Sequence, residues 1–119
     1  MGAQIAGHLA NAGLPVLLFD VTPQAAAGGL ERLRAIKPDP LFHPDVGATI
    51  GTAGFDELTA ASAADWIIEA VVEDLAVKQA LLARLEPNLG PDTIVSSNTS
   101  GIPLASIAAP HSNAFARRF

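Results

Sequence analysis

The sequence predicts an α/β fold in which helices cover both faces of a doubly wound parallel sheet, in three layers. Short apolar stretches typical of strands alternate along the chain with stretches of helical spacing, and this alternation indicates a parallel sheet with covered faces. The chain has 119 residues, of which 50% are hydrophobic. It therefore has the size and composition of one compact domain with a core of its own.

Composition and charge argue against several classes of function. The net charge is −5, and Lys and Arg are not clustered, which argues against a nucleic-acid partner. The chain has no Cys, so it forms neither disulfides nor thiolate metal sites, and its three His are not spaced as metal ligands. The longest apolar run, residues 14–19, is far shorter than the roughly 20 residues that cross a bilayer. Since no leader opens the sequence, we expect a cytoplasmic protein.

The first part of the chain has the order of a dinucleotide-binding unit. Residues 1–12 have helical spacing, Gly13 offers a helix stop, and residues 14–20 predict an apolar strand that ends on an acid. The full fingerprint places G-x-G-x-x-G between a first strand and this helix, with an acid about 20 positions further on that binds the adenosine ribose. Gly2 fits the third glycine and Asp20 fits the acid, so we predict a Rossmann-type fold.

The first two glycines of this fingerprint, and the strand that precedes them, are not in the sequence. The first strand of such a sheet is central and pairs on both sides, so its two neighbours would otherwise present unpaired inner edges. We therefore expect a fold that lacks its first strand here, and a natural polypeptide that extends upstream of Met1. The alternative is a complete protein that begins at Met1.

The remaining elements follow from local signals. Thr22 and Pro23 are an N-cap and a first-turn proline, and they open a helix that should reach about Ile36. Beyond it we expect an irregular proline-rich segment over 37–44, a short strand over 46–50 and a short helix over 55–64. In the last third we expect a helix from Asp74 to about Glu86, a strand over 93–97, a polar loop over 98–101, a short helix over 102–109 and the start of a further strand over 117–119.

The most informative stretch is the turn between a strand and the long helix. Residues 66–68 are a short apolar run that predicts a buried strand. Ligands of open α/β sheets lie just beyond the carboxyl ends of the strands, so residues 70–73 are expected where a cofactor passes. Glu69, Glu73 and Lys78 surround this turn. The alternative is that Glu73 and Lys78 are solvated charges at the entry of the helix.

Several segments occur in a fixed order along nearly the whole chain: residues 1–6 with 9–13, Asp20, residues 65–73 with Lys78, and residues 96–100. Together they resemble the NAD-binding domain of bacterial 3-hydroxyacyl-CoA dehydrogenases, and most of all the dehydrogenase part of the multifunctional fatty-acid oxidation proteins. The resemblance implies that residues 1–119 are part of an NAD-binding domain. It also implies NAD as cofactor, acyl-CoA as substrate, and oxidation of (S)-3-hydroxyacyl-CoA to 3-oxoacyl-CoA in fatty-acid β-oxidation.

The resemblance assigns residues to both ends of the cofactor. Met1 and Gly2 would lie at the pyrophosphate turn, where a helix start offers free N–H groups to an anion. Asp20 would accept hydrogen bonds from the adenosine ribose, and its charge would disfavour a 2′-phosphate, so NAD is expected rather than NADP. The nicotinamide riboside would be lined by a run of three residues with a lysine nearby: Val71, Val72, Glu73 and Lys78.

The polar loop over 98–101 would carry the catalytic residue that this chain contains. Ser100 would hold the 3-hydroxyl of the substrate or the nicotinamide side, and Asn98 would shape the loop. On the residues alone, the loop equally suits an ordinary turn, since Asn, Thr and Ser side chains readily bond to nearby backbone. The family's general base is a His in a His-Phe-Phe-Asn-Pro segment, paired with a Glu, and both are expected beyond Phe119.

The three His of this chain do not replace that base. A base must reach the proton that it removes within about 3 Å or through one water, and neither His8, His43 nor His111 fits this requirement. We therefore expect the segment to bind a dinucleotide but not to transfer hydride by itself. For the full-length protein, a homodimer and a multifunctional complex both stay open.

Two other functions also stay open. One is a different β-hydroxyacid dehydrogenase of the same fold, against which the Ser-Asn-Thr-Ser loop speaks. The other is a non-catalytic dinucleotide-binding or interaction module. Residues 31–44 are shorter than a basic helical extension that contacts coenzyme A in some relatives, so the resemblance assigns no acyl-CoA contacts.

Overall fold

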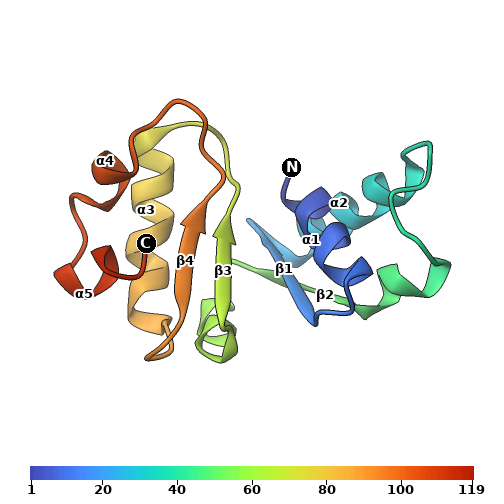
Figure 1. The fold of residues 1–119 in the computed structure, drawn as a ribbon, viewed down its shortest axis with the longest axis horizontal. Coiled ribbons are helices and arrows are strands. Elements are labelled where there is room, and N and C mark those ends of the chain that lie inside the picture. Colours follow the sequence, from blue (N-terminus) through green and yellow to red (C-terminus); the bar gives the residue numbers. More distant parts are fainter. The chain divides into compact units, whose positions relative to one another are not determined.

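The computed structural model describes residues 1–119 and divides the chain into two compact units, residues 1–57 and 58–119. Each unit contains one pair of parallel strands with helices packed beside it, and the two pairs are separate sheets (Figure 1). The predicted alternation of strands and helices is therefore present, but the sheet is partial. No strand precedes the first helix of this chain.

The first unit begins with a helix and then alternates strands and helices. Its elements are α1 (Gly2–Asn11), β1 (Val16–Asp20), α2 (Pro23–Ala35), a 3₁₀ helix (Pro44–Thr49) and β2 (Ile50–Gly54). Gly13 has a φ of 80°, a left-handed conformation that glycine adopts without strain, so it ends α1 and turns the chain towards β1. The hydroxyl of Thr22 accepts a hydrogen bond from the N–H of Ala25 (3.1 Å), which confirms the predicted N-cap of α2.

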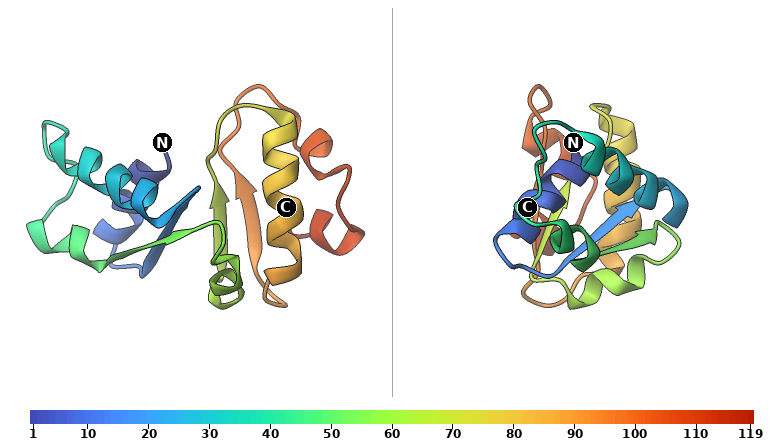
Figure 2. Two further views of the ribbon diagram at one scale, coloured as in Figure 1. Left: turned by 180° about the vertical axis from the view of Figure 1, so that it is seen from behind. Right: turned by 90° about the vertical axis from the view of Figure 1, so that its right-hand side faces the viewer.

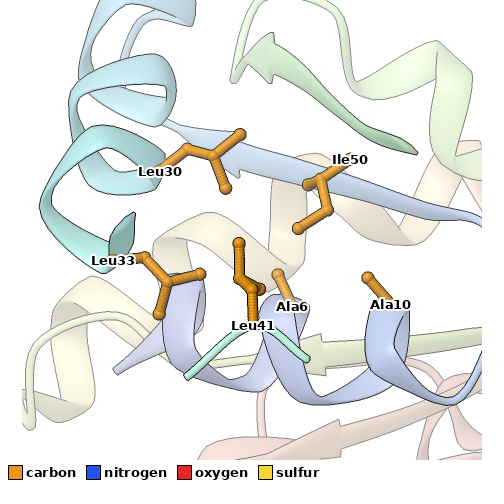
Figure 3. Packing of buried hydrophobic residues seen from close by; sticks show 6 residues of the cluster. All are labelled: Ala6, Ala10, Leu30, Leu33, Leu41 and Ile50. Carbon is orange, nitrogen blue, oxygen red and sulfur yellow. The ribbon is translucent and has the colours of Figure 1, made fainter. Parts of the chain in front are cut away.

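The core of the first unit lies between α1, α2 and β2. Figure 3 shows its side chains converging from these elements and from the loop after α2: Ala6, Ala10, Leu30, Leu33, Leu41 and Ile50. Small residues on α1 allow the close approach of α2, because a Cβ atom at Gly7 would lie 2.7 Å from a methyl group of Leu33. This packing fixes the amino end of α1 relative to the carboxyl end of β1.

The second unit contains the other strand pair and the longest helix of the C-terminal half. Its elements are a 3₁₀ helix (Leu58–Ala63), β3 (Trp66–Glu69), α3 (Leu75–Leu85), a 3₁₀ turn (Glu86–Asn88), β4 (Ile94–Ser97), α4 (Leu104–Ala108) and α5 (Asn113–Ala116). The helix α3 runs back in the direction opposite to β3 and β4 (Figures 1 and 2). Asp74 caps it by accepting from the N–H of Val77 (3.0 Å).

Within each parallel pair, the register places the carboxyl ends of the two strands side by side. β1 and β2 pair from Val16 opposite Ile50 to Asp20 opposite Gly54. In the second unit, β3 and β4 pair along their whole length, so that Glu69 lies opposite Ser97. Each pair therefore brings a polar residue to its carboxyl end, which is the end where α/β sheets bind ligands.

Two predicted elements are wrong in kind or extent. Residues 46–50 do not form a strand: the chain makes the 3₁₀ helix Pro44–Thr49 first, and β2 begins only at Ile50. Pro44 opens this helix and the His43 ring accepts from the N–H of Asp45, so start signals override the apolar run. The helix expected over 55–64 is a shorter 3₁₀ helix, Leu58–Ala63.

The strand β3 is less buried than predicted. Trp66 is 53% exposed, and only Glu69, at the other end, is buried. The reason is the partial sheet: β3 pairs with β4 alone, so no strand covers its other edge. Residues 117–119 form no strand either, although the carbonyl of Arg118 accepts a hydrogen bond from the N–H of Val95 (2.8 Å).

Candidate cofactor and substrate site

The carboxyl end of β1 and the amino end of α1 lie at the same end of the first unit (Figure 1). Met1 is the N-cap of α1 but makes no side-chain cap, so the first N–H groups of the helix are not satisfied by a capping side chain. Asp20 uses one carboxylate oxygen to accept from the N–H of Val21 (2.7 Å). Free helix N–H groups and a half-buried carboxylate are the donor set and the acceptor that a dinucleotide requires.

The strongest electrostatic feature of the second unit is a buried ion pair between Glu69 and Lys78. The Lys78 ammonium lies 2.9 and 3.0 Å from the two carboxylate oxygens of Glu69. The exposed fractions of the two side chains are 0% for Lys78 and 1% for Glu69. The alternative that Lys78 is a solvated charge is therefore wrong, because α3 directs this side chain into the unit, where it meets an opposite charge.

Glu73 connects this pair to the loop after β4. Its Oε2 atom lies 3.4 Å from the Lys78 ammonium, while Oε1 accepts from the Thr99 hydroxyl (2.6 Å) and from the N–H groups of Ser100 (2.9 Å) and Gly101 (3.0 Å). These hydrogen bonds, that of the Thr99 hydroxyl first, lower the pKa of Glu73 from 4.5 to about 2. Glu73 is an exposed residue, as the solvated alternative requires, but its carboxylate is fixed by specific partners.

The hydrogen bonds from Thr99, Ser100 and Gly101 to Glu73, which we call the clamp, hold the loop with the predicted residues Asn98 and Ser100. Ser100 is engaged through its backbone N–H, and its side chain is exposed. Asn98 is exposed as well, and its N–H donates to the carbonyl of Glu69 (2.6 Å), which extends the pairing of the two strands by one bond. The loop is therefore a turn with specific anchors, and it carries an exposed hydroxyl at the carboxyl end of β4.

The turn after β3 exposes apolar side chains at the same end of the unit. Val72 is among the exposed large hydrophobic residues. The N–H of Val71 donates to Oε1 of Glu69 (2.7 Å), so the buried carboxylate also holds this turn. The structure thus joins the turn of Val71, Val72 and Glu73, with Lys78, to the loop that carries Asn98 and Ser100 through the contacts of Glu73. The first three cofactor residues, Met1, Gly2 and Asp20, belong to the other unit.

Sequence reasoning gave no separate role to two polar clusters of the second unit. Glu69 was noted only as part of the turn, and its pairing with Lys78 and Ser97 is not visible from spacing alone. His111, which does not fit the role of the general base, has a side chain that is almost completely buried and lies 3.1 Å from Glu86. The Ser112 hydroxyl also donates to Glu86, and it is the main reason why the pKa of Glu86 is lowered. This second cluster fastens the end of α3 to the turn before α5.

The structure provides neither a metal centre nor a spanning helix. No three His, Asp or Glu side chains are grouped closely enough to hold a metal ion. None of the helices combines the length and the hydropathy that a membrane crossing needs.

Comparison with known proteins decides the family. Residues 1–116 match the family described as the 3-hydroxyacyl-CoA dehydrogenase, NAD binding domain. The chain belongs to this family. The resemblance stated from the sequence is thereby confirmed, and the description of the family names NAD as the cofactor of the domain.

Relatives of this NAD-binding domain family differ in substrate. A probable 3-hydroxyacyl-CoA dehydrogenase of Deinococcus radiodurans is 37% identical over 127 aligned positions, which cover 100% of this chain and 37% of the relative. The 5-formyl-3-hydroxy-2-methylpyridine 4-carboxylate 5-dehydrogenase of Mesorhizobium japonicum is also 37% identical, over 92% of this chain and 37% of that protein. The chain therefore spans little more than a third of the length of these relatives.

Solved structures confirm the Rossmann-type fold of this domain family. The crystal structure of 3-hydroxybutyryl-CoA dehydrogenase from Escherichia coli superposes with a TM-score of 0.79 at 31% sequence identity. The superposition covers 96% of this chain and 25% of that chain. The fold of this chain is accordingly of the Rossmann type, with only a partial sheet in each unit.

Proposed function

We propose that this chain is the NAD-binding part of an NAD-dependent (S)-3-hydroxyacyl-CoA dehydrogenase. In the full-length protein, the reaction would oxidise the 3-hydroxyl of an acyl-CoA to a ketone, as in fatty-acid β-oxidation. The observation that carries the proposal is the clamp of Glu73 on the loop of Thr99, Ser100 and Gly101, because it presents an exposed serine hydroxyl at the ligand-binding end of a domain of the NAD-binding family.

The first unit would hold the adenosine half of NAD. Met1 and Gly2 begin a helix without a capping side chain, so its first N–H groups suit the pyrophosphate. Asp20 accepts from Val21 with one oxygen, and its second oxygen is then available for a ribose hydroxyl. The charge of Asp20 would repel a 2′-phosphate, which favours NAD over NADP.

The second unit would hold the nicotinamide half and the reacting group. Val71 and Val72 would pack on the nicotinamide riboside, and Glu73 and Lys78 would fix the turn that carries them. When bound, NAD supplies the hydride acceptor. Ser100 would orient the 3-hydroxyl of the substrate, and Asn98 would shape the loop. We place the proton acceptor on a His of the full-length polypeptide beyond this chain, since no residue of the chain fits that role.

Several further expectations belong to the same proposal. We expect the full-length protein to act in the cytoplasm on an acyl-CoA substrate. It would work as a homodimer or within a multifunctional complex, and the E. coli relative, which is four times as long as the matched segment, is consistent with companion parts.

The test is a substrate comparison with the full-length polypeptide. Formation of NADH is followed with (S)-3-hydroxybutyryl-CoA and with free (S)-3-hydroxybutyrate at equal concentrations. We expect reduction of NAD with the CoA ester and a kcat/KM at least roughly 10²-fold lower with the free acid, because remote binding energy is lost with the CoA group. Absence of activity with CoA esters would refute the proposal.

A second candidate is an NAD-dependent dehydrogenase of a free hydroxyl compound. The relative from M. japonicum favours it, since its name describes a pyridine carboxylate rather than a CoA ester. The same assay separates the two: equal or better activity on substrates without CoA supports this second candidate.

A further inference from the structure

The Glu69 carboxylate accepts four hydrogen bonds from three partners, and no role in the reaction follows from its position alone. It is buried at the carboxyl end of β3. Its two oxygens accept from the Lys78 ammonium (2.9 and 3.0 Å), from the N–H of Val71 (2.7 Å) and from the Ser97 hydroxyl. One carboxylate thus joins α3, the turn after β3 and the end of β4.

The ammonium of Lys78 has a second carboxylate within reach. Glu73 Oε2 lies 3.4 Å away, further than either oxygen of Glu69. The other oxygen of Glu73 holds the loop of Thr99 to Gly101 through three hydrogen bonds. The contacts therefore form a chain from Glu69 through Lys78 and Glu73 to the backbone of Ser100.

The burial of Lys78 determines which of the two carboxylates neutralises its charge. A buried ammonium without a close partner is very unfavourable, so Lys78 requires one neutralising carboxylate. Glu69 supplies it at hydrogen-bonding distance, and this leaves Glu73 free to bond mainly to the loop. Without the charge of Glu69, the nearest anion for Lys78 would be Glu73, and the attraction would compete with the three donors of the loop.

We propose that Glu69 is a positioning residue of the dehydrogenase reaction: it neutralises Lys78 and thereby keeps Glu73 on the loop that presents Ser100. The inference rests on the proposed function and adds to it a residue that contacts neither cofactor nor substrate. Its effect on turnover passes through Lys78.

A double-mutant cycle in the full-length enzyme tests this dependence. The kcat and KM for (S)-3-hydroxybutyryl-CoA and NAD are measured for the unmodified protein, E69Q, K78M and E69Q/K78M, with each kcat expressed per NAD-binding site. We expect E69Q to lower kcat by roughly 10- to 100-fold, the size of effect that misplacement of a reacting group produces. In the K78M background, the same substitution should change kcat by less than about twofold, since the pathway is already broken.

The cycle separates positioning from a general loss of stability. If Glu69 only stabilises the fold, E69Q lowers the melting temperature while kcat per NAD-binding site stays unchanged, and this result overturns the inference. An equal loss of kcat in both backgrounds also overturns it, because Glu69 would then not act through Lys78. The control D92N removes an exposed carboxylate at the amino end of β4 and should leave kcat unchanged.

Two further arms keep the test decisive. If E69Q does not fold, the cycle is repeated with E69D and E69D/K78M, which keep the negative charge but shorten the side chain. The loss of kcat should again be larger with Lys78 present than in the K78M background, although smaller than for E69Q. Equal losses of kcat in the two backgrounds overturn the inference. Inactivity of the unmodified full-length protein on CoA esters refutes the proposed function instead. Normal activity together with an unaffected E69Q refutes the role of Glu69 alone.

Discussion

The hydroxyl of Thr99 donates a hydrogen bond to Oε1 of Glu73 over 2.6 Å, and so links the loop after β4 to the turn after β3. The two residues come from different connections of the second unit, and both connections lie at the carboxyl ends of the strands. The link matters because it fixes the backbone next to Ser100. The Thr99 hydroxyl is also the largest of the hydrogen-bond contributions that lower the pKa of Glu73 to about 2, ahead of the N–H groups of Gly101 and Ser100.

Removal of the Thr99 hydroxyl should loosen the loop without unfolding the protein. We expect Thr99→Val in the full-length enzyme to lower kcat by roughly tenfold through misplacement of Ser100. The control is Thr59→Val, which changes an exposed threonine of the same unit and should not alter kcat. Steady-state kinetics and melting curves of both variants make the comparison; equal kcat values for both variants would contradict the role of Thr99.

The ionisation of Glu73 should make stability depend on pH. Its pKa in the folded protein is lowered from 4.5 to about 2, so the folded state favours the charged form. This contribution to the free energy of unfolding is complete above about pH 4.5 and is lost as the pH falls towards 2.

Urea unfolding at several pH values checks this dependence. The difference in midpoint between the unmodified protein and Glu73→Gln should shrink as the pH falls below about 4.5, since the glutamine does not titrate. A difference that stays constant down to the acid limit would show that the Glu73 charge does not stabilise the folded state.

The acid of β1 should select the cofactor. We expect Asp20→Ala in the full-length protein to raise the Kd for NAD by roughly 10- to 100-fold, the value of a hydrogen bond to a charged group, while the KM for acyl-CoA changes less. Calorimetric titration with NAD measures the first effect, and steady-state kinetics with the acyl-CoA substrate measure the second. Equal losses for NAD and acyl-CoA would show that Asp20 does not contact the ribose.

The exposed hydroxyl of Ser100 should act in turnover rather than in folding. Ser100→Ala keeps the backbone N–H that donates to Glu73, so the clamp and the affinity for NAD should persist. The kcat should fall by roughly 10²-fold, as when one hydrogen-bond donor to the reacting oxygen is lost. Unchanged kinetics would remove Ser100 from the reacting site.

Elements with strong local signals could be predicted from the sequence. The apolar run that ends at Asp20 and the pair Thr22 and Pro23 define β1 and the start of α2, and both are present in the structure. The strand expected over 46–50 failed because Pro44 starts a 3₁₀ helix. The helix-start signal at Pro44 and the apolar strand pattern over 46–50 cover segments of comparable length, and local patterns do not decide between a helix and a strand there.

The site could be predicted in its composition but not in its contacts. The turn over 70–73 was expected near the cofactor, because ligands of α/β sheets lie beyond the carboxyl ends of the strands, whereas its contact with the loop over 98–101 was not predicted. The burial of Lys78 was not expected, since its partner Glu69 is separated from it by a turn and follows no helical spacing. The hydrogen bond from the Ser100 N–H to Glu73 was not expected either, because it joins segments that are far apart in the sequence.

The most direct test of the proposed cofactor site is a crystal structure of the full-length protein with bound NAD. We predict that the adenosine ribose lies within hydrogen-bonding distance of Asp20 and that the pyrophosphate contacts the amino end of α1. The nicotinamide should lie between the turn over 70–73 and Ser100. A nucleotide bound elsewhere, with Asp20 and Ser100 both free of contact, would contradict this prediction.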